Sequence, residues 1–455
     1  MIDNYLSAKK YLDSLINYEK ITRYPYKKSL KFKRVMLLFK YLKIPYERLR
    51  VIHIAGTKGK GSTAYYCSNF LAACGLKVGV YTSPHLFDFR ERIVIKKSLF
   101  FPKEKKIEIK SRKILGAEVV KLTREIKEKL RKIDIPQKLG TVTFFEISTA
   151  IALKYFLDKK VDLVVLETGL GGRLDATNIV KPLVSLITHI GYDHMDKLGN
   201  RIKEIAYEKS GIIKRQVPVI CSCQRRGVLE VIEAIAKTRK APLFLSSRDF
   251  QIKDLKINKN LTTFNFQFQN FRLRKVKIKL KGKYQAENAA LALATLFLLG
   301  KKEIIKRALT NDIISLNLEG RFELICKKPL IIADVAHNVS SFSVLADNLK
   351  LYYPKYKVIL IFACSKDKDA KKMLKQIAYR NLILTRFDNP RTYEPLELKK
   401  VCRLKEVVLT DNIRQAFEEA RKIYRKNDLI LVSGSLFLVS EAKKFLVSSR
   451  MAKYH

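Results

Sequence analysis

Glycines, lysines and hydroxyl residues gather in one short segment of the chain. Residues 51–63 read Val-Ile-His-Ile-Ala-Gly-Thr-Lys-Gly-Lys-Gly-Ser-Thr, which predicts a strand, a glycine-rich loop and the start of a helix. In such a loop the backbone N–H groups close around phosphate oxygens, Lys60 adds a positive charge and the Ser62 hydroxyl can reach Mg²⁺. The spacing G-x-x-G-K-G-S is shorter than the common G-x-x-x-x-G-K-[ST] pattern, and a plain glycine-rich turn is the structural alternative. The segment predicts binding of a nucleoside triphosphate through Gly56, Thr57, Lys58, Gly59, Lys60, Gly61 and Ser62.

Further polar side chains follow other predicted strands. Ser83 lies in Tyr-Thr-Ser-Pro-His-Leu after the second strand, and a dense segment with three glycines, 167–178, follows the most apolar one. His194 belongs to Ile-Gly-Tyr-Asp-His after the next strand. Open α/β sheets bind ligands at the carboxyl ends of their strands, so these residues are candidates for one site. Glu146 lies on an otherwise apolar helix face, where a buried carboxylate needs either a metal ion or an ion pair.

Three later segments add charged residues. Lys209 lies in Glu-Lys-Ser-Gly-Ile-Ile-Lys, which by its local pattern is a helix end with a capping glycine. Asp334 and His337 belong to Asp-Val-Ala-His-Asn, directly after the first strand of the second half. Arg321 precedes that strand, and we expect it to reach a nucleotide.

Predicted strands and helices alternate along most of the chain. Buried strands are expected near 51–55, 78–82, 161–166, 183–188 and 217–221, and helices near 5–16, 30–42, 117–132, 144–157 and 284–299. Residues 96–113 are basic and are expected to be irregular, whereas 250–281 alternate as hairpin-like strands. Periodicity is lost near 311–319, and a second series of strands follows. The pattern predicts an α/β protein with a P-loop-type, mostly parallel sheet domain at 1–312 and a smaller, Rossmann-like α/β domain at 313–455.

The composition indicates a folded protein with an unusual charge. Of the 455 residues 47% are hydrophobic, and the net charge is +48. Nucleic acid is the obvious hypothesis for such a charge. However, the 91 basic residues are spread along the chain, and the most basic stretch, 272–283, alternates with apolar residues like a strand with one solvated face. We therefore expect no nucleic-acid partner.

The remaining composition points to the cytoplasm. Cys221-Ser-Cys223 lacks the spacing of a zinc or redox pair, so the seven cysteines are expected to be reduced thiols. The longest apolar run, 289–299, is too short to span a membrane, and residues 1–15 lack the apolar core of a signal peptide. We expect a cytoplasmic monomer that does not bind membranes.

In their order, these segments resemble the folylpolyglutamate synthase and dihydrofolate synthase family of the Mur-ligase-like, ATP-dependent amide ligases. The resemblance runs from about residue 10 to about residue 445. It rests on residues 55–62, 81–86, 89–93, 169–178, 191–194, 208–212, 334–338 and 434–436. It implies Mur-ligase architecture and a reaction in which ATP phosphorylates a carboxylate of dihydropteroate or of a folate glutamyl tail. The amine of L-glutamate then attacks the acyl phosphate.

The resemblance also implies roles for individual residues. Lys60 would hold the ATP phosphates, and Lys209 would carry a carbamate. The implied magnesium ligands are Ser83, Glu146 and His194, and the implied catalytic residues are Lys60, Lys209 and His194. In the later segments, Asn288, Arg321 and Asp334 would contact the nucleotide. His337 and Ser435 would lie on the glutamate side.

Some positions depart from the family pattern, and two alternatives stay open. Lys58 stands where many members have Asn, and Ser29–Phe32 replaces the Gly-Leu-x-Arg element of the pterin side, which leaves the substrate preference open. A cell-wall or cyanophycin-type ligase would share the ATP chemistry but not the paired segments 81–86 and 89–93. A nucleic-acid-associated P-loop NTPase would show an apolar strand ending in Asp, whereas the strand at 161–166 is followed by Glu167.

Overall fold

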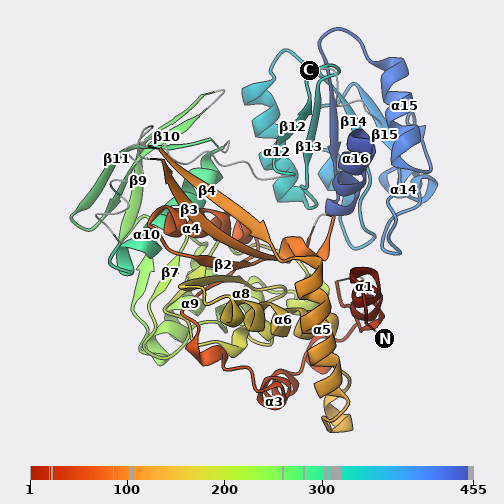
Figure 1. The fold of residues 1–455 in the computed structure, drawn as a ribbon. Coiled ribbons are helices and arrows are strands. Elements are labelled where there is room, and N and C mark those ends of the chain that lie inside the picture. Colours follow the sequence, from red (N-terminus) through yellow and green to blue (C-terminus); the bar gives the residue numbers. More distant parts are fainter. Residues whose placement is uncertain are drawn as a thin grey trace. The chain divides into compact units, whose positions relative to one another are not determined.

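The computed structural model divides into two compact units (Figure 1). It describes residues 2–19, 21, 24–85, 87–101, 106–258, 261–279, 282–301, 306 and 320–448. The first unit contains the described residues up to 306 except residue 21, and the second contains residue 21 and residues 320–448. The predicted boundary at 312/313 lies outside the described residues and stays a prediction.

An eight-stranded sheet forms the centre of the first unit. Its strand order is β4-β3-β2-β5-β1-β6-β7-β8. The strands from β2 to β8 in this order pair in parallel. Strand β3 pairs antiparallel with β2, and β4 pairs antiparallel with β3. The strands are β1 (Val51–Ala55), β2 (Val78–Tyr81), β3 (Ile93–Phe101), β4 (Lys106–Lys113), β5 (Leu163–Glu167), β6 (Val184–Ile187), β7 (Val219–Cys221) and β8 (Leu243–Leu245). The helices are α1 (Tyr5–Ser14), α2 (Tyr26–Ser29), α3 (Phe32–Leu42), α4 (Lys60–Ala73), α5 (Gly116–Leu130), α6 (Phe144–Asp158), α7 (Met195–Leu198), α8 (Ile202–Ser210), α9 (Arg226–Thr238) and α10 (Lys283–Leu298).

The central strands are covered on both faces. All residues of β1, β5 and β6 are buried, as expected for parallel strands covered by helices on both sides. Helix α4 packs on β1, β2, β3 and β5 and against α10. The predicted α/β fold with a mostly parallel first sheet is confirmed.

The prediction for residues 96–113 was wrong. Instead of an irregular segment, β3 and β4 pair as a long antiparallel hairpin at the edge of the sheet, with Ile95 opposite Arg112. Lysines interrupt the apolar alternation in both strands, which hid the strand pattern in the sequence. Tertiary pairing with β2 supplies the stabilisation that local propensity lacks.

A separate three-stranded antiparallel sheet confirms the hairpin pattern predicted for 250–281. It consists of β9 (Phe250–Ile257), β10 (Thr262–Phe268) and β11 (Phe271–Ile278) in the order β11-β10-β9. Residues of β10 alternate between buried and half-buried, and Phe264, Phe266 and Phe268 are buried. The sheet packs against α10.

The second unit has a six-stranded sheet in the order β12-β13-β17-β14-β15-β16, parallel except for β12 against β13. Its strands are β12 (Glu323–Cys326), β13 (Ile331–Asp334), β14 (Lys357–Phe362), β15 (Asn381–Leu384), β16 (Val408–Leu409) and β17 (Asp428–Ser433). Its helices are α12 (Val339–Tyr352), α13 (Ala370–Leu374), α14 (Pro395–Cys402), α15 (Ile413–Ile423) and α16 (Leu436–Ser448). Among the described residues, no helix is both long and apolar enough to cross a membrane.

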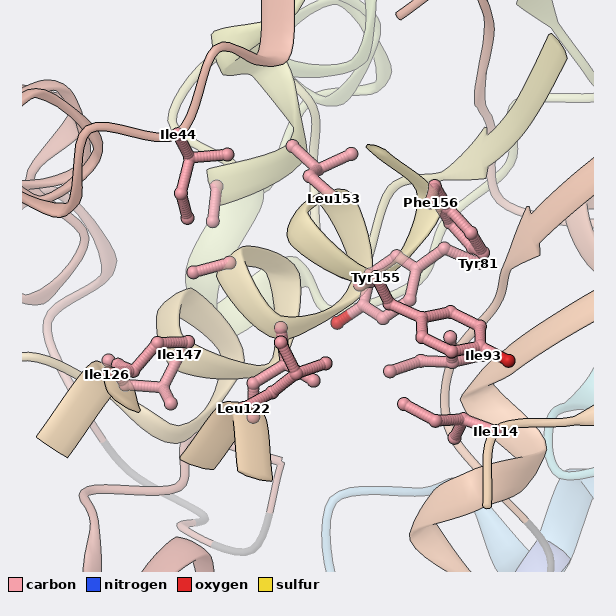
Figure 2. Close-up of a cluster of buried hydrophobic side chains, with 14 of the residues drawn as sticks. Ile44, Tyr81, Ile93, Ile114, Leu122, Ile126, Ile147, Leu153, Tyr155 and Phe156 are labelled. Carbon is pink, nitrogen blue, oxygen red and sulfur yellow. The ribbon is translucent and has the colours of Figure 1, made fainter. Parts of the chain in front are cut away.

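One core cluster packs against the part of the first sheet that contains β2 (Figure 2). Ile147 and Phe156 of α6 pack in it with Tyr81, the last residue of β2. Both α6 side chains are fully buried. This packing holds the carboxyl end of β2, where Ser83 follows, in a fixed place.

Candidate active site

The predicted phosphate loop connects β1 to α4. Gly59 is the N-cap of α4 with φ +84°, and α4 begins at Lys60. A Cβ atom on Gly59 would lie 2.3 Å from Oδ1 of Asn288, and a Cβ atom on Gly56 would lie 1.9 Å from Oγ1 of Thr188. Both positions therefore require glycine. The loop presents the N-terminus of a fourteen-residue helix, which favours an anion.

Backbone contacts hold this loop on the segment that follows β6. The N–H groups of Thr57 and Lys58 donate to the carbonyl of His189 at 2.9 and 3.1 Å. The Thr57 hydroxyl donates to the Gly191 carbonyl at 3.1 Å and accepts from its N–H at 3.2 Å. Burial lowers the pKa of Lys58, which lies near Asp193. The segment with the candidate residue His194 is thus fixed to the phosphate loop.

The carboxylate beside the loop is Glu167, the last residue of β5. A Cβ atom on Gly61 would lie 3.6 Å from its Oε2, and the backbone N–H of Ser83 lies 3.4 Å from the same oxygen. Glu167 is buried, at 4% exposure. The carboxyl ends of β1, β2 and β5 therefore bring Gly61, Ser83 and Glu167 together.

Glu146 has different contacts, so the structure favours the ion-pair interpretation of this residue. Arg34 of α3 contacts both of its oxygens, with Nη2 at 2.8 Å from Oε1 and Nε at 3.0 Å from each oxygen. Oε2 also accepts from the Thr143 N–H at 2.9 Å as part of the capping box of α6. A metal ion would have to displace these contacts.

The position of Glu167 in the sequence already indicated a candidate site residue, whereas the resemblance implied Glu146. Glu167 is the only charged residue at the end of the most apolar strand, which is the place where α/β sheets bind ligands. The Glu146 carboxylate lies on an apolar helix face and therefore needs a partner. The partner is Arg34, which lies 112 positions earlier and was not identifiable from local sequence.

His194 lies where the chain turns sharply. Its φ of +49° is a left-handed conformation, and it is the N-cap of α7. Its backbone N–H donates a hydrogen bond to the Asp193 carboxylate at 3.1 Å. Such a conformation is costly for a residue with a side chain and is frequent at functional sites.

Lys209 lies at the end of α8 and reaches the phosphate loop. Its Nζ donates to the Gly56 carbonyl at 2.8 Å, and the residue is 4% exposed. Burial, and secondarily the positive charge of Lys60, lowers the pKa of Lys209 to about 7. A substantial fraction of this amine is therefore neutral near pH 7.

The glycine-rich segment after β5 holds Lys209 in position. The Arg173 side chain pairs with Glu208 at 2.8 Å, and the Arg173 N–H donates to the Glu208 carbonyl at 2.7 Å. A Cβ atom on Gly172 would lie 2.7 Å from the Lys209 carbonyl, so glycine permits this close approach. The segment 167–178 is therefore partly a support for Lys209.

Asn288 on α10 contacts the phosphate-loop helix directly. Its Oδ1 accepts from the Thr63 hydroxyl at 3.3 Å. It therefore lies beside the loop, as expected for a nucleotide contact.

The candidates of the second unit gather near the end of β13. Asp334 accepts from the N–H groups of Phe322 and Ala336 at 2.7 and 2.8 Å. Burial raises the pKa of Asp334, and the nearby charge of Arg321 opposes this shift. Nδ1 of His337 lies 2.9 Å from the Val335 carbonyl.

Ser435 follows the neighbouring strand β17. It is buried, and its Oγ accepts from the Phe437 N–H at 3.1 Å at the start of α16. Ser433, two residues earlier, donates to the Asp334 carbonyl at 2.8 Å. The segments that follow β13 and β17 thus lie side by side at the carboxyl ends of these two paired strands.

The geometry of the first unit suits transfer of a phosphoryl group. A helix N-terminus and Lys60 can neutralise phosphate charge, and Glu167 and the Ser83 region offer oxygen ligands for a hard cation. In the described part of the chain, no three His, Cys, Asp or Glu side chains gather as a metal site. A cation here would complete its coordination with phosphate oxygens, as Mg²⁺ commonly does.

Comparison with known proteins identifies both units. The Mur ligase middle domain matches residues 112–296, and the Mur ligase glutamate ligase domain matches residues 320–436. The chain is 32% identical over 423 residues to the dihydrofolate synthase/folylpolyglutamate synthase of Bacillus subtilis, covering 91% of this chain and 94% of that protein.

Solved structures agree with this match. Folylpolyglutamate synthase of Mycobacterium tuberculosis, complexed with ADP and AMPPCP, superimposes with a TM-score of 0.83 at 26% identity, covering 97% of this chain and 98% of the other. A folylpolyglutamate synthase complexed with AMPPCP and folate superimposes with a TM-score of 0.79 at 28% identity, covering 98% and 100%. The fold, the two domain matches and the full-length similarity lead to one conclusion: the chain belongs to the folylpolyglutamate synthase and dihydrofolate synthase family of Mur ligases.

Proposed function

We propose that this chain is an ATP-dependent ligase that adds L-glutamate to dihydropteroate or to the glutamyl tail of a folate. The observation that carries the proposal is the convergence of the phosphate loop, Glu167 and Lys209 at one edge of the first sheet. Relatives with the same fold have been captured with an ATP analogue and folate, which supports these substrates.

The reaction has two steps. A substrate carboxylate oxygen attacks the γ-phosphorus of ATP, the bond to the bridging oxygen breaks, and ADP leaves. The glutamate amine then attacks the acyl carbon, loses a proton and expels inorganic phosphate, so an amide bond forms. The loop N–H groups and Lys60 stabilise the negative charge on the transferred phosphoryl group.

Ser83, Glu167 and His194 are our proposed magnesium-binding residues. The buried Glu167 carboxylate, close to the Ser83 backbone and the loop, fits a hard cation that prefers oxygen. When bound, Mg²⁺ would neutralise phosphate charge. Asn288, Arg321 and Asp334 are proposed to contact the nucleotide, and His337 and Ser435 to contact glutamate.

Lys209 is proposed to carry a carbamate. A neutral lysine amine adds to CO₂ and releases a proton, and burial supplies the neutral amine. The product is an anion beside the phosphate loop. We expect Lys209→Ala to lose activity and short carboxylic acids such as formate to restore part of it, whereas a fully active variant would contradict the proposal. Intact mass measured in bicarbonate, with Lys214→Ala as the matched lysine control, tests the carbamate directly.

The main test compares acceptors. Purified protein with ATP, Mg²⁺ and labelled glutamate should form an amide with dihydropteroate, tetrahydrofolate or both. The ratio of the two ligation rates assigns the substrate preference that the sequence left open. Product formed only with cell-wall precursors or a cyanophycin primer would establish the alternative ligase. ATP hydrolysis stimulated by DNA without ligation would establish an NTPase. A cytoplasmic monomer stays our prediction, and size-exclusion chromatography tests the oligomeric state.

A further inference from the structure

The outer face of the three-stranded sheet is strongly basic. Residues 250–279 contain eight Lys or Arg and one Asp, whereas the whole chain contains 91 basic and 43 acidic residues. The sheet is therefore much poorer in acidic residues than the chain. Its one carboxylate, Asp254, accepts a hydrogen bond from Asn265 within the sheet.

The strand register separates the two faces. The buried Phe264, Phe266 and Phe268 face inward, so Thr263, Asn265 and Gln267 of β10 face outward. In the register, Thr263 lies between Lys256 of β9 and Lys277 of β11. The basic side chains of the two outer strands are exposed: Lys253, Lys256, Arg272, Arg274, Lys275 and Lys277.

The outer face therefore has three rows. Exposed cations lie on β9 and β11, with Asp254 of β9 as the one carboxylate among them, and neutral hydrogen-bonding side chains line β10 between them. Neighbouring strands lie about 4.8 Å apart, so the two cationic rows are about 10 Å apart. We refer to this arrangement as the three-row face.

Contrary to the expectation from the sequence that no nucleic acid is bound, we propose that the three-row face binds the backbone of double-stranded RNA without sequence preference. Two cationic rows can pair with the phosphates that border the wide, shallow minor groove of an A-form helix. Asn265 is held within the sheet, because its Nδ2 donates to Asp254 and its Oδ1 accepts from the Lys275 N–H. The Thr263 hydroxyl and the Gln267 side-chain carbonyl oxygen can contact 2′-hydroxyl groups in that groove. The three β10 side chains are not aromatic, so the face lacks the central stacking platform that single-strand binders use. The amides and hydroxyl of that row also do not suit insertion into a lipid bilayer.

The test measures binding of the full-length protein to a labelled RNA duplex of about 16 base pairs by fluorescence anisotropy. The test variant is Lys256→Gln/Arg272→Gln/Arg274→Gln. The matched control removes three exposed lysines from the second unit, Lys371→Gln/Lys375→Gln/Lys400→Gln, and has the same net charge. Each lost phosphate contact lowers the salt dependence of log K by about 1.

We expect the test variant to bind RNA roughly 10²–10³-fold more weakly near 0.1 M salt, with a salt slope lower by about 3, while the control binds like the unchanged protein. Ligation by both variants should stay unchanged. Equal weakening in both variants would overturn the proposal, because it would show that binding follows total charge. Equal affinity for a DNA duplex, or stronger binding to vesicles of anionic lipid, would also overturn it.

Discussion

The ion pair between Arg34 and Glu146 distinguishes a structural carboxylate from a metal ligand. Both side chains are almost fully buried, at 3% and 4% exposure. Removing one partner of a buried pair leaves an uncompensated charge and costs about 3–5 kcal/mol. Glu146→Gln keeps a hydrogen-bond acceptor for Arg34, so we expect the free energy of unfolding to fall by about 3 kcal/mol, the lower end of that range.

Thermal denaturation measures this loss. In domains of about 150–250 residues, a loss of 1 kcal/mol lowers the Tm by about 2–4 °C. With this relation, the Tm of the first unit should fall by about 6–12 °C. The magnesium midpoint of the ligation rate should stay unchanged in the folded variant. Glu167→Gln should show the reverse: a Tm close to that of the unchanged protein and a raised magnesium midpoint.

A double variant supplies the control for the ion pair. Replacing a buried pair by apolar residues of similar volume is often close to neutral, so Arg34→Met/Glu146→Leu should be more stable than Glu146→Gln. The reasoning is refuted if Glu146→Gln keeps its Tm and needs more magnesium. In that case Glu146 would be the metal ligand that the resemblance implied.

Three further variants test individual features. Lys60→Ala should remain folded and lose about 10²–10³ in ligation rate, and turnover near that of the unchanged protein would exclude its phosphate role. Gly59→Ala should raise the KM for ATP, because its φ of +84° and the approach of Asn288 leave no room for a Cβ atom; an unchanged KM would contradict this. Lys96 is buried with Nζ 4.0 Å from the centre of the Tyr65 ring, and burial lowers its pKa from 10.5 to about 7. Between pH 7 and pH 10.5 the unfolded chain therefore binds more protons than the folded protein, so the buried lysine destabilises the fold most where it is charged, below pH 7. Lys96→Met should stabilise the protein by roughly 2–4 kcal/mol below pH 7 and have little effect near pH 10.5. Urea denaturation at both pH values measures this, and a pH-independent effect would argue against the shift.

Much of the fold followed from local patterns in the sequence. Apolar runs such as 163–167 form buried strands because a parallel strand covered on both faces needs apolar residues throughout. The loop at 56–62 could be predicted to bind phosphate because the glycine spacing indicates its backbone conformation and the lysine supplies the positive charge that a phosphate site needs. The family followed from the order of such segments.

Other features depended on contacts between distant residues. The hairpin of β3 and β4 was missed because its lysine-rich strands are stabilised by pairing, not by local propensity. The sequence alone determined which residue types stand at strand ends, and it thus predicted a charged, phosphate-binding site there. Only the tertiary structure decided that Glu146 pairs with Arg34 while Glu167 lies beside the loop, because the partner of a buried charge is chosen by three-dimensional packing and not by distance along the chain.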